Sequence, residues 1–168
     1  MFFDDVYKKY YKELRCLGHQ LNISSEKSED FTQETFLKFY IETKKDIEFQ
    51  NPRAWLYKVY LNLARTYFNN EALKKNNKEI LSGSQLQITD LHEEYSRKEK
   101  QRIVFEMLDK LTEKERSILL LYNHGLSYSE MAEILEINPN SVGTTLVRAI
   151  ESLKQTLKVH YHEMFEQN

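Results

Sequence analysis

The stretch YSEMAEILEINPNSVGTTL, residues 128–146, has the apolar spacing of a helix-turn-helix. Ala132 supplies the small residue that two crossing helices need at their contact. Apolar residues flank the turn and clamp the second helix: Met131, Leu135, Ile137, Val142 and Leu146. Polar side chains lie off that apolar face: Asn140, Ser141, Thr144, Thr145 and Arg148. Small polar side chains in this position can approach phosphates and base edges, so the pattern predicts a DNA-reading helix.

Capping signals predict where the helices around this stretch begin. Capping boxes start at Thr112 and Ser127, each with a glutamate three residues later. Gly125 is expected to close the helix between them, since glycine tolerates the left-handed conformation of a helix end. Asn138 and Pro139 predict a third helix start. The asparagine side chain can accept from the free N–H groups of the first turn, and the N–H that proline lacks is one that the first turn leaves unpaired. Glu136 stands in the turn where glycine is common, and αL geometry is unfavourable for a residue with a side chain.

Three further helices are predicted before residue 70. Apolar residues from Phe3 to Leu21 recur at steps of three and four, and a second helix is expected over about 26–42. Its later half, FLKFYIE, is apolar on most sides and is expected at the centre of a bundle. Asn51 and Pro52 then open a third helix, PRAWLYKVYLNLARTYF. Its expected buried residues are Trp55, Leu56, Val59, Leu63, Tyr67 and Phe68.

The predicted fold class is all-α, with two small helical bundles joined by a flexible linker and the helix-turn-helix in the second. Four Gly and two Pro in 168 residues favour helices. The expected domains are residues 1–70 and 101–165. Residues 71–100 lose the periodicity and contain the triplet SGS, which favours a linker.

Composition excludes several classes of protein. No run approaches the ~18 apolar residues of a membrane span, so no membrane insertion is expected. A single cysteine, Cys16, cannot form an internal disulfide, which fits a cytoplasmic protein, and it is expected to be a small core residue. His160, His162 and Glu163 are interpreted as a solvated tail and not a metal site. With no phosphate loop or nucleophile–base arrangement, we expect no enzyme and no cofactor.

The part of the chain that contains the helix-turn-helix is acidic, which disfavours DNA binding. Residues 101–168 hold seven basic and ten acidic side chains, a net charge of −3, while residues 1–70 carry +1. A free-standing DNA-binding protein is expected to show a basic footprint on its reading domain. The reading helix is therefore expected to bind free duplex weakly and to depend on another source of affinity.

The segment LDKLTEKERSILLLYNHGLSYSEMAEILEINPNSVGTTLVRAIESLK resembles the C-terminal promoter-reading domain of bacterial RNA polymerase sigma factors. Independently, SEDFTQETFLKFY and NPRAWLYKVYLNLA resemble the polymerase-binding and promoter-melting segments of the same family. Two domains with only a linker between them resemble its small extracytoplasmic-function branch. The resemblance implies a sigma factor that binds core RNA polymerase, recognises promoter DNA and pairs with an anti-sigma factor.

The resemblance also implies residue roles. The polymerase-binding surface would comprise Glu29, Asp30, Gln33, Glu34 and Phe36. Asn62 would contact the opened promoter strand with Lys58 and Arg65 holding phosphates. The loop before this helix would capture a flipped base, with Phe49 stacking on the base and Lys44 or Lys45 holding the backbone. The −35 element would be contacted by the polar residues already named on the reading helix and by Val147, which could touch a thymine methyl.

Two alternatives remain open from the sequence. A stand-alone helix-turn-helix regulator would explain the C-terminal segment and leave SEDFTQETF unaccounted for. A sigma-like protein that sequesters partners would explain why Gly143, Thr145 and Ile150 stand where relatives are often basic.

Overall fold

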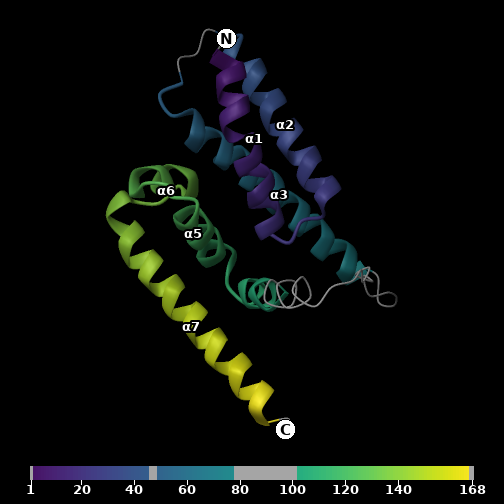
Figure 1. Ribbon diagram of the computed structural model, residues 1–168, viewed down its shortest axis with the longest axis vertical. Coiled ribbons are helices and arrows are strands. Elements are labelled where there is room, and N and C mark those ends of the chain that lie inside the picture. The colour runs from purple at the N-terminus through teal and green to yellow at the C-terminus, as the bar shows by residue number, and fades with distance from the viewer. Residues whose placement is uncertain (1, 46–48, 78–101, 167–168) are drawn as a thin grey trace.

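The computed structural model describes residues 2–45, 49–77 and 102–166, and within these ranges the regular structure is helical. The first bundle comprises α1 (Phe2–Gln20), α2 (Ser25–Thr43) and α3 (Pro52–Asn77). Figure 1 shows α1 and α2 side by side with α3 crossing them, and each helix contacts the other two. This arrangement agrees with the helices predicted from the sequence, and α3 continues beyond the expected end near Phe68.

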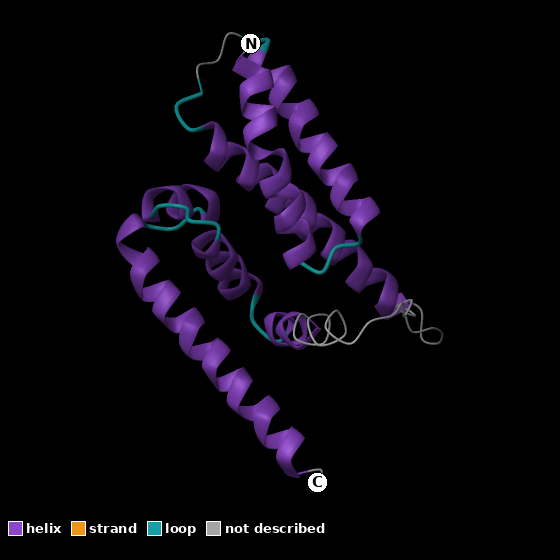
Figure 2. Cartoon of the chain, viewed as in Figure 1, coloured by secondary structure: helices purple, strands orange, loops and turns teal. Residues whose placement is uncertain are grey.

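The second bundle begins with a helix over 102–109 and continues with α5 (Glu113–Asn123) and α6 (Tyr128–Leu135). A single 3-10 turn, η1 (Pro139–Ser141), then leads into the long helix α7 (Val142–Glu166). Loops in the described part of this bundle are short (Figure 2). The bundle thus contains the predicted helix-turn-helix, formed by α6, the turn and the start of α7.

Both capping boxes and both Asn-Pro starts are confirmed. The Thr112 and Ser127 hydroxyls each accept from the backbone N–H three residues on, and the glutamate side chain at that position accepts in return from the capping residue. Asn51 accepts from the N–H of Ala54, and Asn138 from that of Asn140. These bonds depend on residues a few positions apart, so the helix starts were visible in the sequence.

The core of the first bundle differs from the prediction in α3. Ala54, Tyr57, Tyr60 and Ala64 are buried, whereas the expected core residues Trp55, Val59, Leu63, Tyr67 and Phe68 are only half-buried. The buried face is displaced because α3 packs against α1 and α2 on one side and against α6 of the second bundle on another. The prediction from helical phase considered only the first bundle and did not include the contact of α3 with α6.

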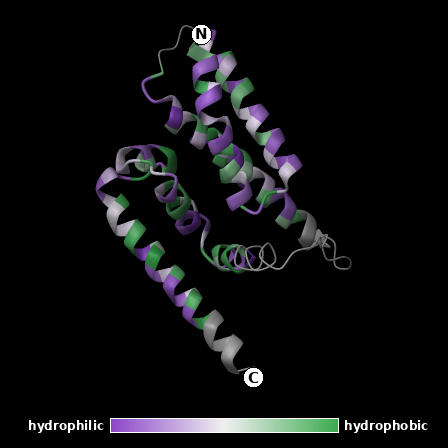
Figure 3. Ribbon diagram, viewed as in Figure 1, coloured by the Kyte–Doolittle hydropathy of each residue, from purple (hydrophilic) through white to green (hydrophobic). Residues whose placement is uncertain are grey.

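The later half of α2 also differs from its expected central position. Phe36 and Phe39 are buried, but Leu37, Tyr40 and Ile41 are 59%, 41% and 48% exposed. The helix therefore buries one face, and its other face carries large apolar side chains into solvent. Figure 3 shows hydrophobic and hydrophilic residues alternating along the helices of this bundle.

Helix α1 approaches its neighbours closely at Gly18. A Cβ atom there would lie 2.0 Å from the Tyr60 hydroxyl oxygen and 2.1 Å from Ser28 Oγ, so no side chain fits. Two residues earlier, Cys16 is exposed, which contradicts its expected place in the core. One face of α1 packs and Cys16 lies off it.

Residues 71–77 of the predicted linker are the end of α3, and residues 78–100 lie outside the described part of the chain. The side chains of His160, His162 and Glu163 also lie outside it, although their backbone belongs to α7. Among the helices whose residues are described, none is long and apolar enough to cross a membrane.

Candidate nucleic-acid interface

The reading surface lies at the start of α7. Val142, Leu146 and Ala149 are at most 4% exposed and hold the helix against its bundle. Their spacing turns a set of side chains outward: Asn140, Ser141, Thr144, Val147 and Arg148. Thr145 is half-buried and its hydroxyl donates to the Ser141 carbonyl at 2.7 Å. Five of the six predicted contact residues are thus exposed on one surface, and Thr145 is partly occupied within the helix.

The turn before this helix has the left-handed residue that the sequence pattern requires. Glu136 has φ 54° and ψ 44°, and its N–H bonds to the Ala132 carbonyl. Only Asn22 and Gly125 share a positive φ with it among the described residues. A glutamate therefore occupies a conformation that costs ~1–2 kcal/mol for a residue with a Cβ atom.

The residues predicted to hold the opened DNA strand lie on one face of α3. Lys58, Asn62 and Arg65 follow one another at four and three residues, which is the spacing of a helix face. Asn62 is exposed. Lys58 Nζ lies 2.8 Å from Glu136 Oε1, and Arg65 forms an ion pair with Glu113. Both cations are therefore engaged by carboxylates of the second bundle.

The loop before α3 is only partly described. Lys45 is exposed and its Nζ lies 2.7 Å from Glu42 Oε1. Phe49 is half-buried, with ring centroids 4.7 Å from Phe39 and 5.7 Å from Trp55. The ring of Phe49 belongs to the aromatic cluster of the first bundle, and its predicted stacking on a flipped base stays a prediction.

A polar face on α2 corresponds to the predicted polymerase-binding surface. Asp30, Gln33 and Glu34 are exposed. Lysines on the same helix pair with two of them, with Lys27 Nζ 3.3 Å from Asp30 and Lys38 Nζ 2.9 Å from Glu34. Exposed pairs of this kind are weak, so the carboxylates remain free to exchange partners.

Two predicted members of that surface have other positions. Glu29 is half-buried; it accepts from the Tyr11 hydroxyl at 2.6 Å and forms an ion pair with Arg15. Phe36 is 2% exposed and packs against Phe3 and Tyr7 of α1. Phe36 therefore holds α2 against α1, and its predicted part in polymerase binding stays a prediction.

Sequence reasoning missed the apolar continuation of this face. Leu37 and Ile41 follow Asp30 and Glu34 at the three- and four-residue steps of one helix face, and both are about half exposed or more. Large apolar side chains gathered beside a polar group commonly mark a protein-binding surface. The signal was present in the helical phase, but the segment had been assigned to the core because of its composition.

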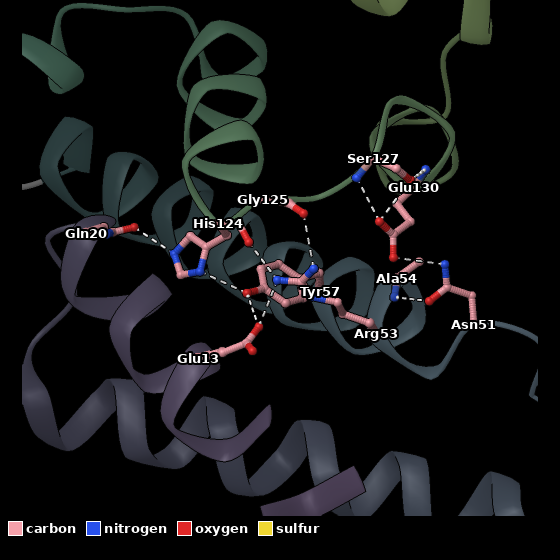
Figure 4. Close-up of polar contacts among 10 residues, drawn as sticks. All are labelled: Glu13, Gln20, Asn51, Arg53, Ala54, Tyr57, His124, Gly125, Ser127 and Glu130. Carbon is pink, nitrogen blue, oxygen red and sulfur yellow. Dashed lines mark hydrogen bonds and ion pairs between the residues drawn. The ribbon is translucent and has the colours of Figure 1, made fainter. Parts of the chain in front are cut away.

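The two bundles meet in a network of polar contacts, part of which is drawn in Figure 4. Its centre is Arg53 at the start of α3. The Arg53 guanidinium donates to the carbonyls of His124 at 2.6 Å and Gly125 at 3.3 Å, and to Glu13 Oε2 at 3.1 Å. The same contact includes Asn51, whose side-chain amide donates to Glu130 Oε1 at 3.1 Å.

His124 of the second bundle also takes part in this contact. Its Nδ1 lies 2.9 Å from the Tyr57 hydroxyl and its Nε2 lies 2.8 Å from Gln20 Oε1. The Tyr57 hydroxyl donates to Glu13 at 3.0 Å. Burial lowers the pKa of His124 below its ordinary 6.5; Glu13 opposes this and Arg53 adds to it. We define the inter-bundle contact as these bonds together with the Lys58–Glu136 and Arg65–Glu113 pairs.

The same two parts of the chain match known families. The family model for sigma-70 region 2 matches residues 6–73, and that for sigma-70 region 4 matches residues 99–153. The RNA polymerase sigma factor YlaC of Bacillus subtilis is 30% identical over 158 residues, which cover 92% of this chain and 91% of that protein. The ECF RNA polymerase sigma-E factor of Haemophilus influenzae is 30% identical over 143 residues, 77% of this chain and 74% of the relative.

Solved structures share the fold at lower identity. The sigma factor RpoE of Bartonella quintana, solved with the anti-sigma factor NepR, has a TM-score of 0.68 and 21% identity over 94% of this chain and 97% of its own. CnrH, solved with the cytosolic domain of CnrY, has a TM-score of 0.70 and 20% identity over 94% and 88%. The two regions match in the family's order, and both relatives are 30% identical to this chain. The chain therefore belongs to the extracytoplasmic-function branch of the sigma-70 family of bacterial RNA polymerase sigma factors.

Proposed function

We propose that this sigma factor acts by giving core RNA polymerase its choice of promoter through two separate DNA-contacting surfaces, one on each bundle. The observation that carries the proposal is that one chain presents three exposed surfaces. Two are the proposed DNA-contacting surfaces on α3 and at the start of α7, and the third is the face of α2 with exposed polar and apolar side chains. The protein binds and positions, and it performs no chemistry on DNA. The domain bounds 1–70 and 101–165 are part of this proposal.

The polymerase-binding surface proposed here is the α2 face of Asp30, Gln33 and Glu34, extended by Leu37 and Ile41. Exposed carboxylates can steer a basic partner, and the two apolar side chains offer area to bury once it has arrived. Glu29 and Phe36 support this face from inside the bundle. The occupant we propose is the coiled coil of the largest polymerase subunit, as the family resemblance implies.

The promoter-melting surface is proposed on α3. Asn62 would contact a base of the opened strand while Lys58 and Arg65 neutralise phosphates on either side. Lys45 would hold backbone at the loop before α3. Phe49 would have to leave its cluster to stack on a base, so its proposed role is support of that loop.

The −35 surface is proposed at the start of α7. Asn140, Ser141, Thr144 and Arg148 would approach phosphates and base edges, and Val147 is exposed enough to touch a thymine methyl. The remaining residue, Thr145, would contribute once its hydroxyl exchanges its bond to Ser141.

Few cations on the reading helix fit a protein that does not bind duplex DNA alone. Affinity for DNA falls with each phosphate contact that is lost, because fewer counterions are released. Tethering to polymerase raises the effective concentration of each weak contact near the other. Polymerase would therefore supply most of the affinity, and this chain would supply discrimination between sequences.

The proposed location is the cytoplasm, where bacterial core polymerase acts. We also propose an anti-sigma protein as a partner. Its support is the family resemblance, together with the likeness in fold to RpoE solved with NepR and to CnrH solved with the cytosolic domain of CnrY.

Run-off transcription with purified core polymerase tests the function. A promoter template is first defined by sequencing transcripts after overproduction, since shared upstream sequences give both elements. Glu34→Lys reverses the charge of the proposed polymerase surface and should abolish both the transcript and co-purification with core. Asp5→Lys makes the same charge change at an exposed residue of α1 and should leave both unchanged.

The outcomes separate the alternatives. A stand-alone regulator would bind its DNA and fail to co-purify with core, and Glu34→Lys would have no effect on it. A sequestering protein would bind core without yielding a transcript. Either result with the wild-type chain would overturn the proposed function.

A further inference from the structure

Glu29 of α2 is held by three donors, although it stands beside the exposed residues of the proposed polymerase-binding surface. Its Oε1 accepts from the Tyr11 hydroxyl at 2.6 Å and from Gln33 Nε2 at 2.9 Å, and its Oε2 forms an ion pair with Arg15. The side chain of Glu29 is 28% exposed. Both carboxylate oxygens are therefore engaged within the first bundle, which leaves Glu29 poorly placed to meet a partner itself.

The two donors from α1 fix the position of this carboxylate. Tyr11 and Arg15 are four residues apart, which places them on one face of α1, and α1 packs against α2. Arg15 is itself anchored, because its Nη2 donates to Ser25 Oγ at 3.1 Å. Hydrogen bonds with a charged acceptor are stronger than neutral ones, so these contacts hold the carboxylate in one place.

The third bond determines which end of the Gln33 amide faces outward. An ionised carboxylate accepts hydrogen bonds and has no proton to donate, so only the NH2 group of Gln33 can bond to Glu29. The amide is planar and carries its oxygen on the other arm, so the carbonyl oxygen of Gln33 is turned away from Glu29. The side chain of Gln33 is exposed, which leaves this oxygen open to a binding partner.

Asp30 and Glu34 present the same kind of group on the same helix face. Gln33 and Glu34 lie three and four residues after Asp30, and all three side chains are exposed. With Gln33 held in this orientation, the face offers hydrogen-bond acceptors, and a reversed amide would place an NH2 group among them. Such a face suits a partner that offers arginine or lysine side chains, which donate and do not accept.

We propose that Glu29 is a positioning residue for polymerase binding, which holds Gln33 by its amide nitrogen so that three acceptors face the partner together. The inference rests on the proposed polymerase-binding role of this α2 face. Its benefit is preorganisation, because a glutamine that is already oriented loses less conformational freedom when the partner binds. Removing the orientation should weaken binding by about 2- to 10-fold, which is the cost of ordering one flexible side chain.

Competition for core polymerase measures this effect on the whole chain. The wild-type chain is labelled with fluorescein at Cys16, which is exposed and is the only cysteine, and unlabelled chains displace it from core. Glu29→Gln should compete about 2- to 10-fold less well than unlabelled wild type. Glu26→Gln makes the same change at an exposed residue in the first turn of α2 and should compete as wild type does. Equal competition by the two variants would overturn the proposal.

A double-variant cycle separates positioning from a purely structural role of Glu29. In a chain that already carries Gln33→Ala no amide remains to be oriented, so adding Glu29→Gln should cost no further affinity for core. Its effect on the urea midpoint should persist in that background, because the bonds to Tyr11 and Arg15 are lost in either case. A loss of affinity that is the same in both backgrounds would show that Glu29 acts through helix packing, against the proposed role.

Exchanging the two side chains provides a rescue. Glu29→Gln combined with Gln33→Glu keeps the net charge and the hydrogen bond between the two positions, with an amide at position 29 donating to a carboxylate at position 33. An acceptor oxygen still faces outward from position 33, so this double variant should compete nearly as well as wild type. A loss as large as that of Glu29→Gln alone would contradict the importance of the outward acceptor.

Nuclear magnetic resonance of the free chain reports the orientation itself. In a nitrogen–proton correlation spectrum, one side-chain amide proton of Gln33 should be shifted downfield and protected from exchange by its bond to Glu29. Glu29→Gln should return this proton to the ordinary position of an exposed glutamine. An ordinary position in the wild-type chain would refute the proposed hold on Gln33.

Glu34→Lys distinguishes a failure of this inference from a failure of the function on which it rests. If Glu34→Lys competes as well as wild type, the α2 face is not the polymerase-binding surface and the proposed function of that face fails. If Glu34→Lys abolishes competition while Glu29→Gln and Glu26→Gln behave alike, the face is correct and only the positioning role of Glu29 is refuted.

Discussion

Replacing Gly18 by alanine should destabilise the first bundle strongly, because the added methyl group has no space. Its Cβ would lie 2.0 Å from the Tyr60 hydroxyl oxygen, 2.1 Å from Ser28 Oγ and 2.8 Å from Ser28 Cβ. Both neighbours are almost fully buried, and their hydroxyls share a hydrogen bond of 3.0 Å. The tyrosine cannot withdraw without breaking that bond and shifting α1 from α2 and α3.

The expected loss follows from three contributions. Overpacking a filled core costs about 1–3 kcal/mol. Leaving a buried hydroxyl without its partner costs about 1–3 kcal/mol. Alanine returns about 1 kcal/mol through its better helix propensity. The free energy of unfolding should therefore fall by about 1–5 kcal/mol, which at a slope of about 2 kcal/mol per molar lowers the urea midpoint by about 0.5–2.5 M.

Urea unfolding followed by tryptophan fluorescence measures this loss. Trp55 is the only tryptophan and packs against the core of the first bundle, so its emission reports that bundle. The matched variant is Gly143→Ala in α7, where the nearest atom to a new Cβ is 3.6 Å away. It should be neutral or stabilising by up to about 1 kcal/mol. A loss at Gly18 below about 0.5 kcal/mol would refute the close approach of α1.

Two further predictions concern the second bundle. Hydrogen bonds from Ser152 and then Thr112 lower the pKa of Glu115 from 4.5, so its stabilising effect is complete above pH 4.5 and is lost as the pH falls through the lowered pKa. Glu115→Gln should flatten that part of the pH dependence of urea unfolding, and an unchanged curve would contradict the assignment. Glu136→Gly should raise the midpoint of thermal unfolding by circular dichroism, since it removes left-handed strain; a lower midpoint would show that the Lys58 pair outweighs it.

The features that sequence reasoning predicted well are those specified by neighbours in the chain. The capping boxes at Thr112 and Ser127 and the left-handed turn at Glu136 each depend on a few consecutive residues. The apolar face of Val142 and Leu146 follows from one helical period. The geometry of such local features is set by residues close together in the sequence, so it can be predicted without knowing which helices meet.

The features that were missed depend on which helices meet. Phe36 and Phe49 were assigned to surfaces by family resemblance, but aromatic rings of neighbouring helices enclose both. Tyr57 was not expected in the core, and it is buried because the second bundle covers α3 from a side that helical phase cannot indicate. Lys58 and Arg65 were expected to be free for phosphates, and their partners lie 78 and 48 residues away in sequence.

The acidity of the DNA-reading half of the chain has a physical consequence beyond weak duplex binding. An acidic side chain near a DNA-facing surface repels phosphates, so its presence on a promoter-binding protein opposes the main source of affinity. That opposition is tolerable if polymerase supplies the affinity. Glu136 shows a second demand on these acids, because glycine would suit the turn better but could not form the ion pair with Lys58 that joins the two bundles. On this argument the charge balance of the second bundle is set by its fit to the first bundle as much as by its fit to DNA.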